Sequence, residues 1–378
     1  MRIHLDHNAT TPVCPEAVSA MTRVLREEFG NPSSVALEGA RARSLVEAAR
    51  EDVAALLGAA PDHVRFTSGA TEANNTLLFG LLGPGDHVVT TQIEHPSVSV
   101  ALDVLAGRGI LVDRVAPDAT GCVPLEAMEA AIRPETRLVC VIWANNETGA
   151  IQPIPAIAER CRAQGIWLHA DATQAIGKVP VGLAATPVDS IASSAHKLGG
   201  PKGIGALVAR DQKAIRPLLV GGGQERGLRG GTENVAGIVG YGAACRAVAA
   251  EGPLRGERMR ALRDRLWQGL VERIGAVRWN GAPETTLPNT LNVELEGLSG
   301  EALLQALDLE GIAVSAGAAC HSGSVEPSKI LLAMGRTPAQ AQASLRFSVG
   351  PGVDAEQIDR VLERLEALVP RLRRLGAA

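Results

Sequence analysis

The chain has 378 residues, of which 46% are hydrophobic and 21% charged, and its formal net charge is −4. This balance is typical of a globular protein with one large and one smaller domain, and it excludes a general electrostatic attraction to nucleic acid. The sequence also lacks the run of about 20 apolar residues that spans a membrane, and its first residues form no signal-peptide apolar region. We therefore expect a cytoplasmic protein.

From about residue 60 to 210, apolar runs of strand length alternate with helical patterns, and one further helical pattern precedes this block. Continuous apolar strands between helices predict an α/β fold with a mostly parallel, seven-stranded sheet that helices cover on both faces. Helices are expected at 39–57, from Ala70, after Pro96, at 124–132 and at 155–164. Strands are expected at 63–67, 87–91, 110–116, 137–144, 166–171, 190–195 and 204–210.

A glycine-rich loop, 221–232, separates this block from a long helix that is expected from Val235 to Leu270 with an interruption near Gly252. The pattern then restarts as a smaller α+β domain, so we expect a large domain over 12–255 and a small one made of 1–11 and 256–378. The small domain should contain strands at 290–294, 312–315 and 344–349, a helix at 300–309 and a last helix from Asp354.

Ligands of such sheets bind beyond the carboxyl ends of the strands. Lys197 and Asp171 both lie at such ends. A lysine amine can form a Schiff base with an aldehyde and an aspartate can pair with a pyridinium nitrogen, which together indicate pyridoxal 5'-phosphate (PLP). The alternatives are a solvated surface lysine and an aspartate that caps the next helix. Gln174 then either reaches the ring hydroxyl or is a surface amide.

Two segments offer a phosphate site. Ser68–Thr71 starts a helix directly after a strand, where main-chain N–H groups bind anions, although a plain helix cap would look the same. The loop 221–232 either offers its amides and Thr232 to a phosphate or is a flexible turn. His95, at another strand exit, either stacks on a pyridine ring and moves protons or is structural.

Two further side chains suggest reaction chemistry. Cys320 lies among small residues and is either a nucleophilic thiol on a mobile loop or an inert free cysteine. Arg346 lies inside an apolar strand and needs a carboxylate, from the substrate or from an internal salt bridge. The six cysteines form no CxxC pair, so we expect neither a metal site nor a disulfide framework.

Together these segments resemble the group I (NifS/IscS type) cysteine desulfurases of the aminotransferase class V family of PLP enzymes, which have fold type I. The similarity runs over nearly the whole chain. It rests on the segments Leu5–Pro12, Gly30–Ser34, Thr67–Glu72, Glu94-His95, Asn145–Gly149, Asp171–Gln174, His196-Lys197, Arg229–Thr232, the Cys320 loop and Ser344–Gly350.

The resemblance implies a role for each matching residue. Lys197 would hold PLP, and Cys320 would attack the substrate sulfur and carry it as a persulfide. The family is dimeric, so Thr232 would reach the phosphate of the partner subunit's cofactor. Asp171 would pair with the ring nitrogen, Gln174 with the ring hydroxyl and His95 with the ring face; Ala70, Thr71, Ser194 and His196 would hold the phosphate; Asn146 and Arg346 would position the substrate.

Two departures from the family pattern bear on function. Ala36 stands where the family commonly has a histidine, two residues after the Asn-Pro-Ser-Ser segment. The run Gly317–His321 is similar to selenocysteine lyases, whereas Ser322–Ser328 returns to the desulfurase pattern.

We therefore expect conversion of L-cysteine to L-alanine, with the sulfur passed to an acceptor protein such as an iron–sulfur scaffold. The alternatives are a selenocysteine lyase, another class V enzyme, or a non-catalytic sulfur-handling protein. tRNA thiolation and DNA sulfur modification are other pathways that the family serves.

Overall fold

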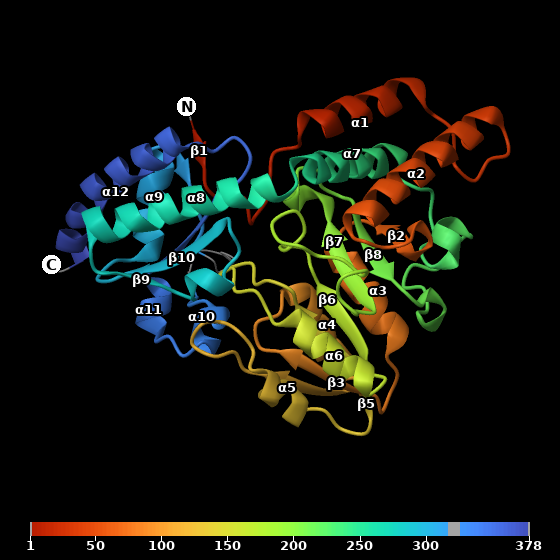
Figure 1. The fold of residues 1–378 in the computed structure, drawn as a ribbon, viewed down its shortest axis with the longest axis horizontal. Coiled ribbons are helices and arrows are strands. Elements are labelled where there is room, and N and C mark those ends of the chain that lie inside the picture. Colours follow the sequence, from red (N-terminus) through yellow and green to blue (C-terminus); the bar gives the residue numbers. More distant parts are fainter. Residues whose placement is uncertain (1, 317–325, 377–378) are drawn as a thin grey trace.

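The computed structural model describes residues 2–316 and 326–376. Figure 1 shows two parts side by side: a large α/β part around a long sheet, and a smaller part that contains the N-terminal strand and the last helix. A site between them can therefore draw side chains from both.

The large part is built on a seven-stranded sheet with the order β2-β8-β7-β6-β5-β3-β4. Only β8 is antiparallel to its neighbours, so the predicted mostly parallel sheet is confirmed. Its strands are β2 (Val64–Thr67), β3 (His87–Thr91), β4 (Leu111–Val115), β5 (Thr136–Ile142), β6 (Trp167–Asp171), β7 (Ser190–Ser194) and β8 (Gly205–Ala209).

Helices cover both faces of this sheet, as the apolar strands predicted. In β5, Val139 and Val141 point into one core, and Leu138 and Cys140 into the other, because side chains alternate along a strand. The first core packs against α1 (Pro15–Glu27), α2 (Leu37–Leu56), α5 (Leu125–Ala130), α6 (Ile154–Ala163) and α7 (Val235–Glu251), and the second against α3 (Ala70–Leu81) and α4 (Pro96–Ala106).

The smaller part has its own sheet and core. Strand β10 (Thr290–Leu295) lies between β12 (Ser344–Ser348) and β9 (Val277–Trp279), and both pairings are antiparallel. Strand β1 (Ile3–His4) pairs in parallel with β11 (Ile312–Ala313). The helices are α8 (Pro253–Gly269), α9 (Gly300–Leu309), α10 (Lys329–Ala333), α11 (Pro338–Gln342) and α12 (Ala355–Gly376).

The core of the smaller part joins Ile3 and Leu5 to side chains of α8, β10, β12 and α12. This grouping supports the predicted division into 12–255 and 1–11 plus 256–378, which stays a prediction. The predicted helix break is confirmed: α7 and α8 meet at Gly252, whose φ of +54° lies in the left-handed region that favours glycine.

The sequence did not predict α1, β9, α10 or α11. Strand β9 has three residues and each of α10 and α11 has five, which is too short for a periodic pattern to emerge. The predicted strand 312–315 pairs with β1 over two residues only. Within the described part of the chain, no helix is long and apolar enough to cross a membrane.

Candidate active site

A cavity of about 620 Å³ lies at the carboxyl ends of β5, β6 and β7, where the sequence predicted the site. Residues of the smaller part, including Asn8 and Arg346, close one side of it. The predicted site residues that line it are Ala70, Thr71, His95, Asn146, Asp171, Gln174, Ser194, His196, Lys197 and Arg346.

Lys197 ends a short 3₁₀ turn, Ala195–Lys197, that follows β7 directly. Its Nζ atom donates hydrogen bonds to the main-chain oxygens of Asn8 (2.6 Å) and Ala9 (2.7 Å). Burial, followed by the positive charge of Arg346, lowers the pKa of Lys197 to about 8. Lys197 is thus a half-buried cavity residue, and a far larger share of its amine is uncharged at neutral pH than in a free lysine.

Asp171 is the buried last residue of β6. Its Oδ2 atom accepts a hydrogen bond from Asn74 Nδ2 at 2.8 Å, and its Oδ1 atom accepts one from the main-chain nitrogen of Thr173 at 3.0 Å. The second bond closes a local turn; residues 173–178 form turns and no helix follows β6 directly, so Asp171 is not the helix cap that the sequence left open. These two donors compensate for the loss of water around the buried carboxylate. The position of Asp171 at a strand end did not by itself show how its charge is stabilised.

His95 is the N-cap of α4. Its Nδ1 atom accepts a hydrogen bond from the main-chain nitrogen of Ser97 at 3.1 Å and lies 2.8 Å from Ser97 Oγ. Burial is the largest cause of the lowered pKa of His95. The imidazole is therefore neutral near pH 7 and is available to stack on a flat ring in the cavity.

The entrance to α3 has the geometry of an anion site. Ala70 and Thr71 are the first residues of this helix, and both line the cavity. Gly69 is the N-cap. A Cβ atom at Gly205 would lie 2.7 Å from Gly69 Cα, so glycine is required where β8 passes the start of α3. Main-chain N–H groups at such a helix start bind phosphate.

Two side chains complete this anion site from the end of β7. Ser194 and His196, two residues later, both line the cavity. Burial, and then the charges of Lys197 and Lys202, lower the pKa of His196 to about 4. The neutral ring and the nearby lysines suit a dianionic phosphate.

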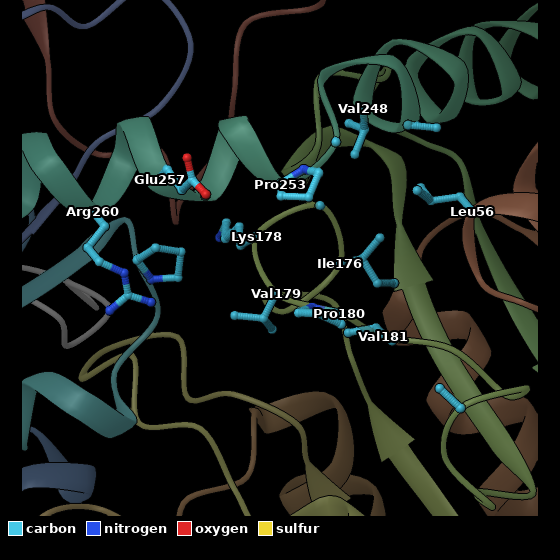
Figure 2. Close-up of a pocket in the computed structure, with 16 residues that line it drawn as sticks. Leu56, Ile176, Lys178, Val179, Pro180, Val181, Val248, Pro253, Glu257 and Arg260 are labelled. Carbon is cyan, nitrogen blue, oxygen red and sulfur yellow. The ribbon is translucent and has the colours of Figure 1, made fainter.

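Gln174 lines the cavity, and Lys178 lies behind it. Gln174 Nε2 donates to the main-chain oxygen of Asn8 at 2.9 Å, and Lys178 Nζ donates to Gln174 Oε1 at 2.8 Å and to Asn8 Oδ1 at 3.2 Å. Lys178 also lines a separate cavity of about 470 Å³ beneath α8, where Figure 2 shows it beside Pro253 and Glu257. Lys178 thus lies between the two cavities.

Arg346 is buried on β12. Its Nη2 atom pairs with Asp6 Oδ1 at 2.5 Å, and its Nη1 atom donates to the main-chain oxygen of Asn146 at 2.8 Å. The internal salt bridge that the sequence left open is therefore present. The Nε atom has no hydrogen-bond partner among the residues described, and Arg346 still lines the cavity.

The glycine-rich loop 221–232 is tied down at Glu225. The buried carboxylate of Glu225 accepts two hydrogen bonds from Arg50, at 2.8 and 2.9 Å, and one from the main-chain nitrogen of Phe66 at 2.8 Å. Thr232 is exposed and does not line the cavity of its own chain. A phosphate contact from Thr232 therefore requires a second chain.

Cys320 lies outside the described residues. The described residues on either side of it are held near the cavity: Ser315 lines it, and Ser328 Oγ donates to the carboxylate of Glu147.

The cavity fits PLP on observations of this structure. A lysine with a lowered pKa, a buried carboxylate and a helix-start anion site face one space of about 620 Å³. The buried Thr173 Oγ1 in its wall has no hydrogen-bond partner among the described residues, as expected of a group that awaits a ligand.

Sequence reasoning gave no role to Asn8, Asn74, Ser97 or Lys178. Asn8 and Gln174 are 166 positions apart, so only the folded chain shows their contact. For Lys178 the sequence contained only a weak indication of its contact with Gln174, namely that the two residues are four positions apart in one short segment.

The chain is similar to known proteins over almost its full length. The family model "Aminotransferase class-V" matches residues 3–361. A cysteine desulfurase of Cereibacter sphaeroides is 45% identical, with 99% of this chain and 97% of that protein covered, and the cysteine desulfurase IscS of Serratia proteamaculans is 43% identical, with 99% and 94% covered. A solved NifS-like protein superposes with a TM-score of 0.92 at 36% identity and covers 98% of this chain and 100% of its own.

Proposed function

Because the chain belongs to the aminotransferase class-V family and is a PLP-dependent cysteine desulfurase, we propose that its reaction takes place in the cavity between β6, β7 and Arg346. The observation that carries this assignment is that Lys197 and Asp171 line one cavity, with the α3 anion site beside them. Fold similarity by itself would not assign these residues.

The cofactor is held by residues of three kinds. Lys197 would bind it covalently through Nζ, Asp171 would pair with the ring nitrogen, and His95 would stack on the ring face. Lys178 donates to Gln174 Oε1, so the amide turns its Nε2 donor the other way. Gln174 would therefore donate to the ring oxygen through Nε2. The phosphate is held by the group Ala70, Thr71, Ser194 and His196.

When bound, PLP supplies an aldehyde that captures the substrate amine and a ring that withdraws electrons from its α-carbon. Lys197 Nζ removes the proton at Cα, and the main-chain oxygens of Asn8 and Ala9 accept hydrogen bonds from the protonated amine. Arg346 Nε and the side chain of Asn146 orient the substrate carboxylate.

The substrate sulfur is transferred to the thiol of Cys320. The thiolate forms an S–S bond with the cysteine sulfur as the Cβ–S bond breaks, and Cβ takes a proton, so that L-cysteine and Cys320–SH become L-alanine and Cys320–SSH. The balance requires no external oxidant. Transfer of the outer sulfur to an acceptor protein frees the thiol again, and we propose an iron–sulfur scaffold as that acceptor.

A homodimer completes the site. The exposed position of Thr232 supports a contact with the partner subunit's phosphate. Phe29, Val35 and Val220 are 87%, 99% and 86% exposed, and a partner subunit that covered them would remove this apolar surface from water. Figure 1 shows the segments that carry them on the side of the large part facing away from the smaller part. A cytoplasmic location also stays a prediction.

Product analysis tests the proposal. Wild-type protein loaded with PLP should form alanine and sulfide from L-cysteine in equal amounts when a reductant is present. Lys197→Ala should form neither, whereas Lys213→Ala, at an exposed lysine remote from the cavity, should match the wild type. Selenocysteine measured in parallel distinguishes the lyase alternative: turnover of selenocysteine with none of cysteine would overturn the proposal.

A further inference from the structure

One face of β6 carries a row of polar side chains that leads to Asp171. Trp167, His169 and Asp171 alternate along this strand, so they lie on the same face, beneath α3. His169 and Asn74 of α3 are fully buried, and each forms hydrogen bonds on both of its polar ends. A buried network of this kind is costly unless every member has a partner.

The direction of each hydrogen bond in this row follows from its two ends, an indole that can only donate and a carboxylate that can only accept. Trp167 Nε1 can only donate, and it donates to Ser190 Oγ at 2.8 Å. At the other end, the carboxylate of Asp171 can only accept, so Asn74 turns Nδ2 to Asp171 and Oδ1 to His169. His169 therefore carries its proton on Nε2, which donates to Asn74 Oδ1 at 2.9 Å, and its Nδ1 atom accepts from Ser190 Oγ, 2.9 Å away.

Asn74 divides the row into two branches. With Oδ1 turned to His169, its Nδ2 donates to Asp171 Oδ2 at 2.8 Å and to Ser97 Oγ at 2.8 Å. Ser97 Oγ then donates to His95 Nδ1, which already accepts a hydrogen bond from the main-chain nitrogen of Ser97. Both bonds require a lone pair on Nδ1, so the neutral His95 ring carries its proton on Nε2.

We propose that Asn74 is a positioning residue of the desulfurase: it supplies a donor to Asp171 and, through Ser97, holds His95 as the Nε2–H tautomer. This inference rests on the proposed roles of Asp171 and His95 at the cofactor. In this tautomer Nδ1 faces Ser97 and the other ring nitrogen, Nε2, carries the proton. His95 therefore offers a hydrogen-bond donor, and not a lone pair, at Nε2.

Burial of the same groups supports this arrangement. Burial lowers the pKa of His169 to about 4, so this ring is neutral at pH 7.5 and exists as one tautomer or the other. The opposite tautomer would turn the Asn74 oxygen towards the carboxylate of Asp171. Two acceptors facing each other in a buried site would lose the hydrogen bond and add repulsion.

The first test is the tautomer of each ring in the cofactor-free protein, measured at pH 7.5 by NMR of ¹⁵N-histidine-labelled chain and assigned with His95→Gln and His169→Gln. The expected result is Nε2–H for both His95 and His169. Nδ1–H at either ring, or a charged His95, would overturn the proposal. This reading needs no cofactor, so it is independent of whether PLP binds at Lys197.

The second test compares two substitutions of Asn74 by PLP titration of the cofactor-free protein. Asn74→Asp keeps the shape but cannot donate, so it should weaken PLP binding at least as much as Asn74→Ala, by roughly 10- to 100-fold. A role in packing alone predicts the reverse, with near wild-type binding by the isosteric Asn74→Asp, and that result would overturn the proposal.

A matched control exists in the smaller part. Asn280 is also fully buried, and its Nδ2 donates to Asn292 Oδ1 and Ser344 Oγ, both at 2.9 Å. Asn280→Asp and Asn280→Ala should lower thermal stability but leave PLP affinity and kcat within about twofold of the wild type. Equal losses of PLP affinity at both asparagines would show a general folding effect and contradict the assignment.

Discussion

Lys178 Nζ donates a hydrogen bond to Gln174 Oε1 across 2.8 Å, and both side chains are buried. Burial, and then the charges of Lys197, Arg255 and Arg346, hold the pKa of Lys178 well below its usual range. The amine therefore acts as a donor to two amide oxygens, those of Gln174 and Asn8, instead of as one half of an ion pair.

Removal of this amine tests its contact with Gln174. Lys178→Met keeps the length of the side chain but leaves two buried oxygens without a donor, so PLP affinity should fall about 5- to 20-fold. Absorbance titration of the cofactor-free protein measures this change. In a Gln174→Leu background the same substitution should have little further effect; a full additional loss there would mean that Lys178 acts by another route.

The lowered pKa of Lys197 predicts how PLP binding depends on pH. Only the neutral amine attacks the aldehyde, so the association rate should rise about tenfold per pH unit below pH 8 and level off above it. Stopped-flow absorbance follows the reaction. Free Nα-acetyl-lysine in the same buffers corrects for the titration of PLP itself. A midpoint near the usual lysine value of about 10.4 would contradict the described environment of Lys197.

Cys320 and Cys14 provide a matched pair of thiol substitutions. Cys320→Ser should bind PLP with the wild-type absorption spectrum yet release no sulfide from L-cysteine, because the group that receives the sulfur is gone. Cys14→Ser should retain activity, since burial raises the pKa of the Cys14 thiol and this residue does not line the cavity. Full activity of Cys320→Ser would show that its thiol takes no part.

Buried and exposed ion pairs should differ in their effect on stability. Glu225→Ala leaves the guanidinium of Arg50 without its buried partner and removes an acceptor from the main chain of Phe66, so it should destabilise the fold by about 3–5 kcal/mol. Asp359→Ala breaks the exposed pair with Arg265 and should leave stability almost unchanged, because solvent and salt screen charges at the surface. Chemical denaturation of the PLP-loaded variants compares them.

Apart from α1, the strand and helix order of the large part could be predicted because its strands are continuous apolar runs and its helices follow strand exits, as at Ala70 and Pro96. The same pattern placed Asp171 and Lys197 at one edge of the sheet. The roles of Asn8 and Asn74 could not be predicted, because their hydrogen bonds depend on tertiary packing: Asn74 meets Asp171 from 97 positions away. Polar side chains in mid-helix carry no periodic signal of their partners.

The alternatives left open at Arg346 and Asp171 show the same limit. A buried arginine in a strand indicated a carboxylate partner, but the sequence did not distinguish Asp6 from a substrate. A strand-end aspartate indicated either a helix cap or a cofactor contact; in the structure a turn and no helix follows β6, and Asp171 lies in the cavity wall. At both positions the residue type predicted the kind of partner that the side chain needs, but only the folded structure shows which residue that partner is.

The most direct test of the account is the site of covalent attachment of PLP. The loaded protein is reduced with borohydride, digested and analysed by mass spectrometry. The account predicts a pyridoxyl-phosphate adduct on Lys197 alone. Two other lysines lie nearby: Lys202 lines the same cavity and Lys178 lines the neighbouring one. An adduct on either of them, or an unmodified Lys197 in fully loaded protein, would contradict the account.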